Sequence, residues 1–113
     1  MAKQLIGSIQ ASNDDEFKKV MQAECLELLG DIEFHDNSKN YEKALEYYYE
    51  SCTLKGSNVN IYIKLGKTYE KLREFDEAIT NLRKAIRRDK RNFTAYYRLG
   101  LCYIRNNMRE EGV

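Results

Sequence analysis

Apolar residues in the middle of the chain recur at the spacing of amphipathic helices. Two consecutive series carry this pattern, one over 60–72 (Ile61, Tyr62, Leu65, Tyr69 and Leu72) and one over 75–88 (Phe75, Ala78, Ile79, Leu82, Ala85 and Ile86). Because an α-helix has 3.6 residues per turn, intervals of three and four place each series on one face of a helix. Only Arg73 and Glu74 separate the two series, so the pattern predicts a helical hairpin.

The same periodicity begins further upstream, with a series made of Phe17, Val20, Met21, Cys25, Leu28, Leu29 and Ile32. Asn13, followed three residues later by Glu16, has the form of a helix start. We therefore expect a first helix from near Asp14 to near Phe34. Residues 1–13 are then a mobile N-terminal segment or an extra partial helix.

The boundaries of the second helix are marked by polar residues and glycine, because the chain contains no proline. The stretch 35–40 has the composition of a long turn, and Ser38 or Asn40 is expected to cap the helix that follows. Gly56 is expected to end that helix, because glycine adopts the left-handed conformation of a C-terminal cap without strain.

A repeat of 34 residues organises these helices. Shifting the sequence by 34 places Tyr62, Leu65, Gly66 and Tyr69 over Tyr96, Leu99, Gly100 and Tyr103. The same shift carries Tyr41, Ala44, Leu45 and Tyr48 onto Phe75, Ala78, Ile79 and Leu82. Two independent sets of positions thus agree on one period, which is the sequence pattern of a repeat architecture.

These residues resemble the tetratricopeptide repeat signature, in which an aromatic residue precedes Leu-Gly and then Tyr, and an Ala follows in the second helix. The positions that carry the resemblance are Gly30, Ala44, Tyr62, Leu65, Gly66, Tyr69, Ala78, Tyr96, Leu99, Gly100 and Tyr103. In the first unit Glu33 stands where the signature has Tyr, and Phe34 is expected to substitute for it.

The resemblance implies an all-α fold, a right-handed solenoid of tandem helix-turn-helix units. It has about two and a half to three repeats with a longer first helix. The repeat domain spans 14–113, in units of about 23–58, 59–92 and a truncated 93–113, whose second helix would begin near Arg109. A glycine inside a helix costs about 1 kcal/mol relative to alanine, so Gly66 and Gly100 are expected at close helix contacts.

Composition limits the functions that this chain can have. Its 113 residues suit one domain, and 19 basic against 18 acidic residues leave a formal net charge of +1. Global charge therefore favours neither nucleic acid nor a membrane surface, and no apolar stretch has the length of a membrane span. Three cysteines in no metal-ligand spacing indicate reduced thiols in the cytoplasm or the nucleus.

Candidate catalytic and cofactor chemistry is sparse. The single histidine, His35, lies in a predicted turn, with no nucleophile or second histidine near it in sequence. No phosphate loop, metal-ligand spacing or nucleophile motif occurs. We therefore expect no enzyme activity, no metal and no cofactor.

Two conspicuous runs have structural explanations beside functional ones. In Tyr47-Tyr48-Tyr49 only Tyr48 falls on the core face, so packing explains the run better than stacking or phosphorylation. The stretch 83–91 holds six basic residues in nine. It could bind phosphates or an acidic protein, but it also suits the end of a helix, where cations favour the dipole.

The resemblance also implies a binding groove, lined by the first helix of each unit. Its residues in this sequence would be Glu27, Asp31, Asn60, Ile63, Lys64, Lys67, Lys71, Tyr97, Arg98, Leu101 and Arg105, with Glu24, Leu28, Phe34 and Thr94 beside them. This groove would be acidic at its N-terminal end and basic elsewhere, with apolar residues interleaved. It would suit a protein or peptide partner with apolar and acidic groups.

A subset of the family holds the C-terminal carboxylate of heat-shock chaperones. The matching positions here are Glu27, Asp31, Lys64, Thr94 and Arg98, of which only Arg98 fits. Two carboxylates would repel that ligand, so the sequence disfavours this clamp.

The main hypothesis is thus a protein-protein interaction module, an adaptor or scaffold, that binds a peptide or short helix. One alternative is an oligomerisation element that associates with itself through an uncapped C-terminal end, where Cys102 and Met108 would be uncovered. Another is nucleic-acid binding through the basic run 83–91, which the balanced charge disfavours.

Overall fold

A computed structural model describes the backbone of residues 2–37 and 39–110, and the side chains of 14–37 and 39–108. The described chain is entirely helical, which confirms the all-α solenoid. Its five helices are α1 (Ala2–His35), α2 (Tyr41–Lys55), α3 (Val59–Lys71), α4 (Phe75–Arg88) and α5 (Phe93–Glu110). Within this part of the chain, no helix is both long and apolar enough to cross a membrane.

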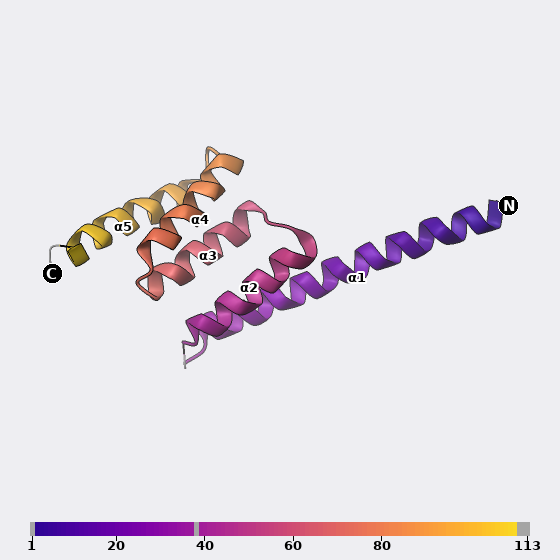
Figure 1. Cartoon of the computed structure of the whole chain (residues 1–113), viewed down its shortest axis with the longest axis horizontal. Helices are drawn as coiled ribbons and strands as arrows, with labels where there is room; N and C mark the ends of the chain where they lie inside the picture. The colour runs from indigo at the N-terminus through magenta and orange to yellow at the C-terminus, as the bar shows by residue number, and fades with distance from the viewer. Residues whose placement is uncertain (1, 38, 111–113) are drawn as a thin grey trace.

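The helices form two successive hairpins followed by a fifth helix (Figure 1). The first hairpin joins α1 to α2 and the second joins α3 to α4, while α5 packs on α4 and touches α3. The N-terminal part of α1 extends well beyond α2 (Figure 1). A helical hairpin cannot bury its second apolar face alone, and stacking the units covers it.

Asparagine residues cap the N-termini of three of these helices. The side-chain Oδ1 of Asn40 accepts from the backbone N–H of Lys43 at 3.2 Å, as the sequence predicted. Asn58 and Asn92 cap α3 and α5 in the same way, each with an N···O distance of 3.0 Å. Gly56 follows α2 with φ at +83° and donates its N–H to the carbonyl of Cys52, so its predicted role is confirmed.

Two predicted helix ends are wrong. The first helix continues to Ala2, so Asn13 lies inside α1 and is not its cap. Of the two alternatives for the N-terminal segment, the helical one describes residues 2–13.

At the other end, α5 runs without a turn to Glu110 and passes the predicted helix start near Arg109. Residues 101–110 contain neither glycine nor proline, so nothing local stops the helix. Residues 111–113 lie outside the described part of the chain.

The core is a series of clusters between neighbouring helices. One cluster joins Ala44 and Tyr48 of α2 to Ile61 and Leu65 of α3, and Phe34 packs against it from α1. This contact agrees with the expectation that Phe34 replaces the missing signature tyrosine. A second cluster, of Phe75, Ala78, Ile79, Leu82 and Cys102, joins α4 to α5. Tyr48 is buried, whereas Tyr47 is half-buried and Tyr49 exposed, as the helical periodicity predicted.

Glycine permits close packing at two of the three repeat positions. A Cβ added to Gly66 would lie 2.7 Å from Cγ of Leu82, and one added to Gly30 would lie 2.6 Å from Cε1 of Tyr48. The prediction for Gly66 is therefore confirmed. The same prediction for Gly100 is wrong, because no described atom lies within 4 Å of a Cβ at that position. The two buried glycines face the second helix of their own unit, and no described helix covers α5 at Gly100.

Candidate functional site

Three shallow depressions follow one another along α3. The first, of about 270 Å³, is lined by Glu27, Asn60, Ile63, Lys64, Lys67, Asn92 and Thr94. The second, of about 180 Å³, is lined by Asp31, Phe34, His35, Tyr48, Lys64 and Lys67. The third, of about 330 Å³, is lined by Phe34, His35, Lys39, Tyr41, Lys67, Lys71 and Arg98. Because neighbouring depressions share Lys64 or Lys67, they form one channel with α3 as its floor, which we call the α3 groove.

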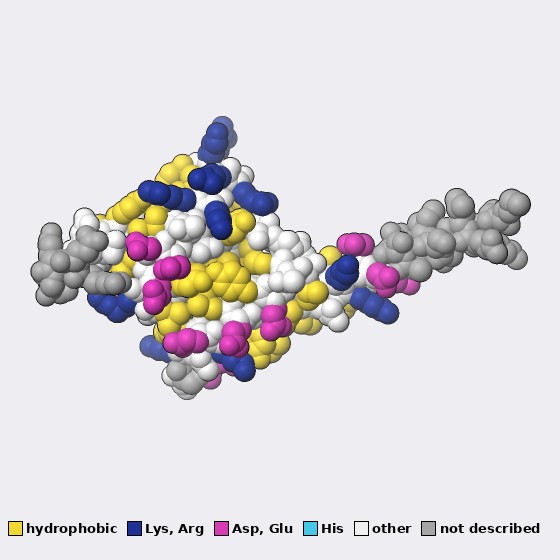
Figure 2. Space-filling model, viewed as in Figure 1, with side chains coloured by type: hydrophobic (Ala, Val, Ile, Leu, Met, Phe, Trp, Pro, Cys, Tyr) yellow, Lys and Arg dark blue, Asp and Glu magenta, His cyan; other side chains and the backbone are white. Residues whose placement is uncertain are grey.

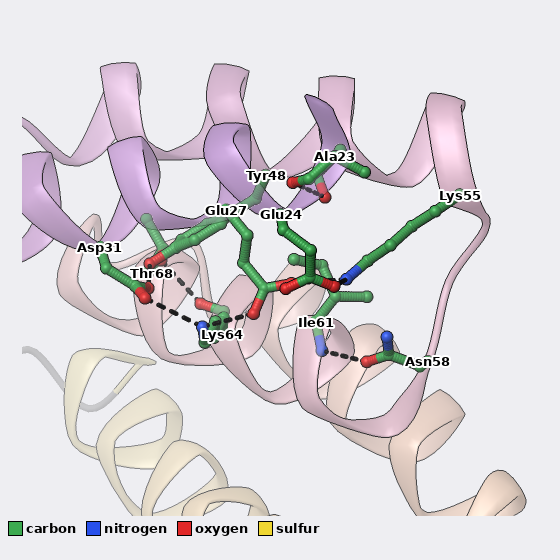
Figure 3. Close-up of polar contacts among 11 residues, drawn as sticks. Ala23, Glu24, Glu27, Asp31, Tyr48, Lys55, Asn58, Ile61, Lys64 and Thr68 are labelled. Atoms are coloured by element: carbon green, nitrogen blue, oxygen red, sulfur yellow. Dashed lines mark hydrogen bonds and ion pairs between the residues drawn. The ribbon is translucent and has the colours of Figure 1, made fainter. Parts of the chain in front are cut away.

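Lys64 lies at the centre of a network of ion pairs in this groove (Figure 3). Its ammonium group is 2.6 Å from a carboxylate oxygen of Glu27 and 3.0 Å from one of Asp31. Lys55 bonds the same Glu27 at 3.2 Å and Glu24 at 2.5 Å. The network therefore links α1 to both α2 and α3. The negative charges of the predicted acidic end of the groove are compensated by positive charge from its predicted basic middle.

The pKa values of the network follow from these contacts. Burial alone would raise the pKa of Glu27, but the ammonium groups of Lys64 and Lys55 hold that pKa below its usual range. Burial would lower the pKa of Lys64, but the carboxylates of Glu27 and Asp31 hold it above its usual range. The hydroxyl of Tyr48 donates to Asp31 at 2.7 Å, and burial together with this bond raises the pKa of Tyr48. All three shifts favour the state in which the network is intact at neutral pH.

A second network surrounds Glu70, which sequence reasoning missed. Its side chain is only 1% exposed, and its carboxylate pairs with Arg105 and lies 4.0 Å from Nη1 of Arg98. The thiol of Cys102 is 3.6 Å from the same carboxylate, and burial followed by this charge raises the pKa of Cys102 to about 12. From the sequence, both Cys102 and Met108 were expected to be uncovered. That expectation is wrong for Cys102, which is buried, and correct for Met108, which is exposed.

Lys67 and Lys71 differ from Lys64 in having no ion pair among the described residues. The ammonium group of Lys67 lies 5.7 Å from the centre of the Phe34 ring. Burial and the neighbouring charge of Arg98 lower the pKa of Lys67. The groove thus keeps ammonium groups that form no ion pair with a described residue near the end of α1.

The predicted groove residues fall into two groups. Glu27, Asp31, Asn60, Ile63, Lys64, Lys67, Lys71 and Arg98 line the three depressions, whereas Tyr97, Leu101 and Arg105 do not. Ile63 is 9% exposed and belongs to a core cluster with Ala85 and Ala95, so it supports the groove floor more than it faces a ligand. Tyr97 is 65% exposed on α5. The assignment of these residues to ligand binding stays a prediction.

Five lining residues come from outside the predicted first helices of the units: Tyr48 and Asn92, and the group made of His35, Lys39 and Tyr41. His35, Lys39 and Tyr41 enter the groove from the end of α1, the following loop and the start of α2. The stretch 35–40, which the sequence predicted to be a long turn between the two helices of the first unit, was the signal for this extra wall.

The basic run 83–91 spans the end of α4 and part of the loop before α5 (Figure 2). On the face viewed there, Lys and Arg side chains gather over the end of α4, and apolar and acidic side chains lie below them. Lys84 and Arg88 lie 5.9 and 5.5 Å from the centre of the Tyr62 ring. No cation of the run forms an ion pair with a described carboxylate. No residue of this run lines the three depressions of the α3 groove.

Comparisons with known proteins agree with this architecture. A family model described as tetratricopeptide repeat matches residues 63–107. The solved TPR domain of Arabidopsis OM64 superposes with a TM-score of 0.72 at 26% identity, covering 82% of this chain and 75% of that one. DnaJ homolog subfamily C member 7 of Homo sapiens is 32% identical over 78 residues, and its Mus musculus counterpart is 31% identical. The match covers 66% of this chain but only 16% of each of those longer proteins.

Proposed function

Since this chain belongs to the tetratricopeptide-repeat family, we propose that it binds a peptide or a short helix of a protein partner along the α3 groove. The observation that carries this proposal is the continuity of the three depressions along α3, between walls from α1 and α5. A row of shallow depressions along one helix suits an extended chain better than a compact small molecule. As an adaptor or scaffold segment, the protein would need no catalytic group.

The charges of the groove narrow the chemistry of the partner. Because Glu27 and Asp31 pair with Lys64, the lining lysines without an ion pair among the described residues are Lys39, Lys67 and Lys71. Phe34 and Tyr41 contribute apolar surface beside them. The partner segment would therefore carry acidic groups near the end of α1 and small or apolar groups elsewhere.

A selection from a displayed peptide library tests this function. We expect enriched peptides to bind the wild type, and to bind at least tenfold more weakly to Asn60→Trp/Thr94→Trp, because two indole rings would fill the first depression. Both positions are exposed, so the fold should persist. The matched control, Glu46→Trp/Glu50→Trp on exposed positions of α2, should bind normally. Peptides that bind all three proteins equally would contradict the groove as the binding site.

A second candidate function is self-association through α5, favoured by the open side of Gly100. In the second unit the side chain of Leu82 covers Gly66, but no described side chain covers the equivalent Gly100. Ile104 and Met108 are exposed on the same helix. Apolar surface of this kind commonly receives a partner.

If this candidate is correct, the wild type should dimerise in the high micromolar range. The variant Ile104→Glu/Met108→Glu should then sediment as a monomer. A wild type that sediments as a monomer at millimolar concentration would eliminate self-association by this route.

The compartment is a further part of the proposal. The three cysteines are unpaired, with Cys25 exposed, Cys52 half-buried and Cys102 buried. Unpaired thiols, one of them exposed, suit a reducing compartment, so we propose that the domain resides in the cytoplasm or the nucleus.

A further inference from the structure

The third depression of the α3 groove has an unusual set of lining residues. Every charged or titratable side chain except Tyr41 is basic: His35, Lys39, Lys67, Lys71 and Arg98. The remaining residues are the aromatic Phe34 and Tyr41. No carboxylate lines this depression, although the chain as a whole carries nearly equal numbers of acids and bases. We call it the cationic pocket.

Separate elements of the fold bring these basic residues together. His35 ends α1, Lys39 belongs to the loop before α2, Lys67 and Lys71 lie one helical turn apart on α3, and Arg98 lies on α5. The loop is anchored by a hydrogen bond from Asn40 N–H to the carbonyl of Glu33 at 3.1 Å, and Lys39 adopts a left-handed φ of +48°. The pocket is therefore a product of the tertiary fold.

The cations of the pocket are poorly satisfied within the protein. Lys67 and Lys71 form no ion pair with a described residue, in contrast to Lys64 one turn earlier on α3. Arg98 lies 4.0 Å from Glu70, at the limit of an ion pair, and its buried Nε atom has no hydrogen-bond acceptor among the described residues. An anion bound in the pocket would supply the negative partner that these cationic groups do not have within the protein.

The electrostatic environment of Lys67 supports the same conclusion. Burial and the nearby charges of Arg98 and Lys64 lower its pKa, and they outweigh the opposite effect of the carboxylates of Asp31 and Glu70. A bound anion would reverse this effect, since an opposite charge within a few ångströms stabilises an ammonium group.

We propose that the cationic pocket binds the phosphate group of a phosphorylated side chain on the partner segment. The proposal rests on the proposed function of the α3 groove. A phosphate monoester carries a charge of about −1.5 to −2 at neutral pH and three acceptor oxygens. Cations that converge from α3, α5 and the loop before α2 match three oxygens better than the two of a carboxylate. The volume of about 330 Å³ holds a phosphorylated side chain.

Phosphorylation would then control the interaction. The cationic pocket adjoins the second depression through Phe34, His35 and Lys67, so a segment that continues along α3 can occupy both. Adding the phosphate would strengthen binding of that segment, whereas removing it would leave only the contacts along the rest of the groove.

The experiment is an NMR titration of the ¹⁵N-labelled wild type with O-phosphoserine, at constant ionic strength and with serine as the reference. We expect saturable shifts at the backbone amides of Lys39, Lys67, Lys71 and Arg98. In Lys67→Gln/Lys71→Gln the affinity should fall at least tenfold. The matched control, Lys84→Gln/Arg88→Gln, removes two charges from the basic run on α4 and should bind as the wild type does. Unchanged amide spectra away from the substitutions will establish that both variants are folded.

Three outcomes would overturn the proposal. One is equal shifts with phosphoserine and serine. Another is a phosphoserine affinity that falls in the Lys84→Gln/Arg88→Gln control but not in Lys67→Gln/Lys71→Gln, which would move the anion site to α4. The third is displacement of phosphoserine from the pocket by a short single-stranded RNA at lower concentration than by any phosphopeptide, which would assign the pocket to nucleic acid.

The peptide selection keeps this inference separate from the proposed function. Peptides without phosphate that bind the wild type and lose affinity for Asn60→Trp/Thr94→Trp would leave the groove function intact, even if phosphoserine does not bind. Among such peptides, synthetic pairs with serine and phosphoserine should differ at least tenfold in affinity for the wild type, and much less for Lys67→Gln/Lys71→Gln.

Discussion

Replacing Gly66 by leucine is expected to lower the free energy of unfolding by about 2 kcal/mol or more, because overpacking a close contact forces side chains and backbone apart. Even a Cβ at this position would meet Cγ of Leu82 at 2.7 Å, and Leu82 itself is fully buried. The measurement is the midpoint and slope of chemical denaturation followed by circular dichroism.

Gly100→Leu provides the matched control for this prediction. The two glycines occupy equivalent positions of the repeat, but a Cβ at Gly100 meets no described atom within 4 Å. Leucine is a better helix former than glycine by up to about 1 kcal/mol, so Gly100→Leu should leave stability unchanged or raise it. Equal destabilisation by both substitutions would show that close packing does not distinguish the two positions.

Removing both arginines around Glu70 is expected to have the largest effect of any polar substitution. Breaking a buried ion pair by removing one side typically costs about 3–5 kcal/mol, because it leaves an uncompensated charge in the interior. Glu70 is almost completely buried, whereas Arg98 and Arg105 are partly exposed. Because the two arginines are partly exposed, water can reach the Glu70 carboxylate in their place and solvate part of its charge. The free energy of unfolding of Arg98→Ala/Arg105→Ala should therefore fall by about 3 kcal/mol, near the lower end of that range.

Adding a third substitution, Glu70→Leu, to this double variant provides the control. It removes the carboxylate that the double variant leaves without partners, so the triple variant should recover most of the lost stability. Denaturation at neutral pH would measure all three proteins. If the triple variant is as unstable as the double one, the loss comes from the packing of the arginine side chains and not from the isolated charge.

The repeat and its core were predictable because they depend on local periodicity. Positions such as Leu65 and Leu82 face inward in any helix that keeps the spacing of three and four residues, and both are buried here. The caps at Asn40 and Gly56 were predictable for a similar reason, since a cap bonds to backbone groups only a few residues away. The full lengths of α1 and α5 were not predictable, because a capping residue permits a helix to end without requiring it.

The balance of charge in the groove could not be inferred from the repeat pattern. Lys64 and Lys67 both appeared as free groove cations, yet Lys64 is paired with Glu27, 37 residues away, while Lys67 has no such partner. Which lysine meets a carboxylate depends on the rotation and separation of α1 and α3. A difference of three residues along α3 is enough to decide it.

The sequence by itself thus determined the helical repeat, its period and its main helix contacts. The tertiary structure alone decided that Glu70 is buried between two arginines, that the face of α5 at Gly100 is open and that five basic residues converge on one pocket. The physical reason is one of range. Helix formation and the choice of a buried face are set within a few residues, whereas ion pairing and charge clustering depend on distances between helices that are far apart in the chain.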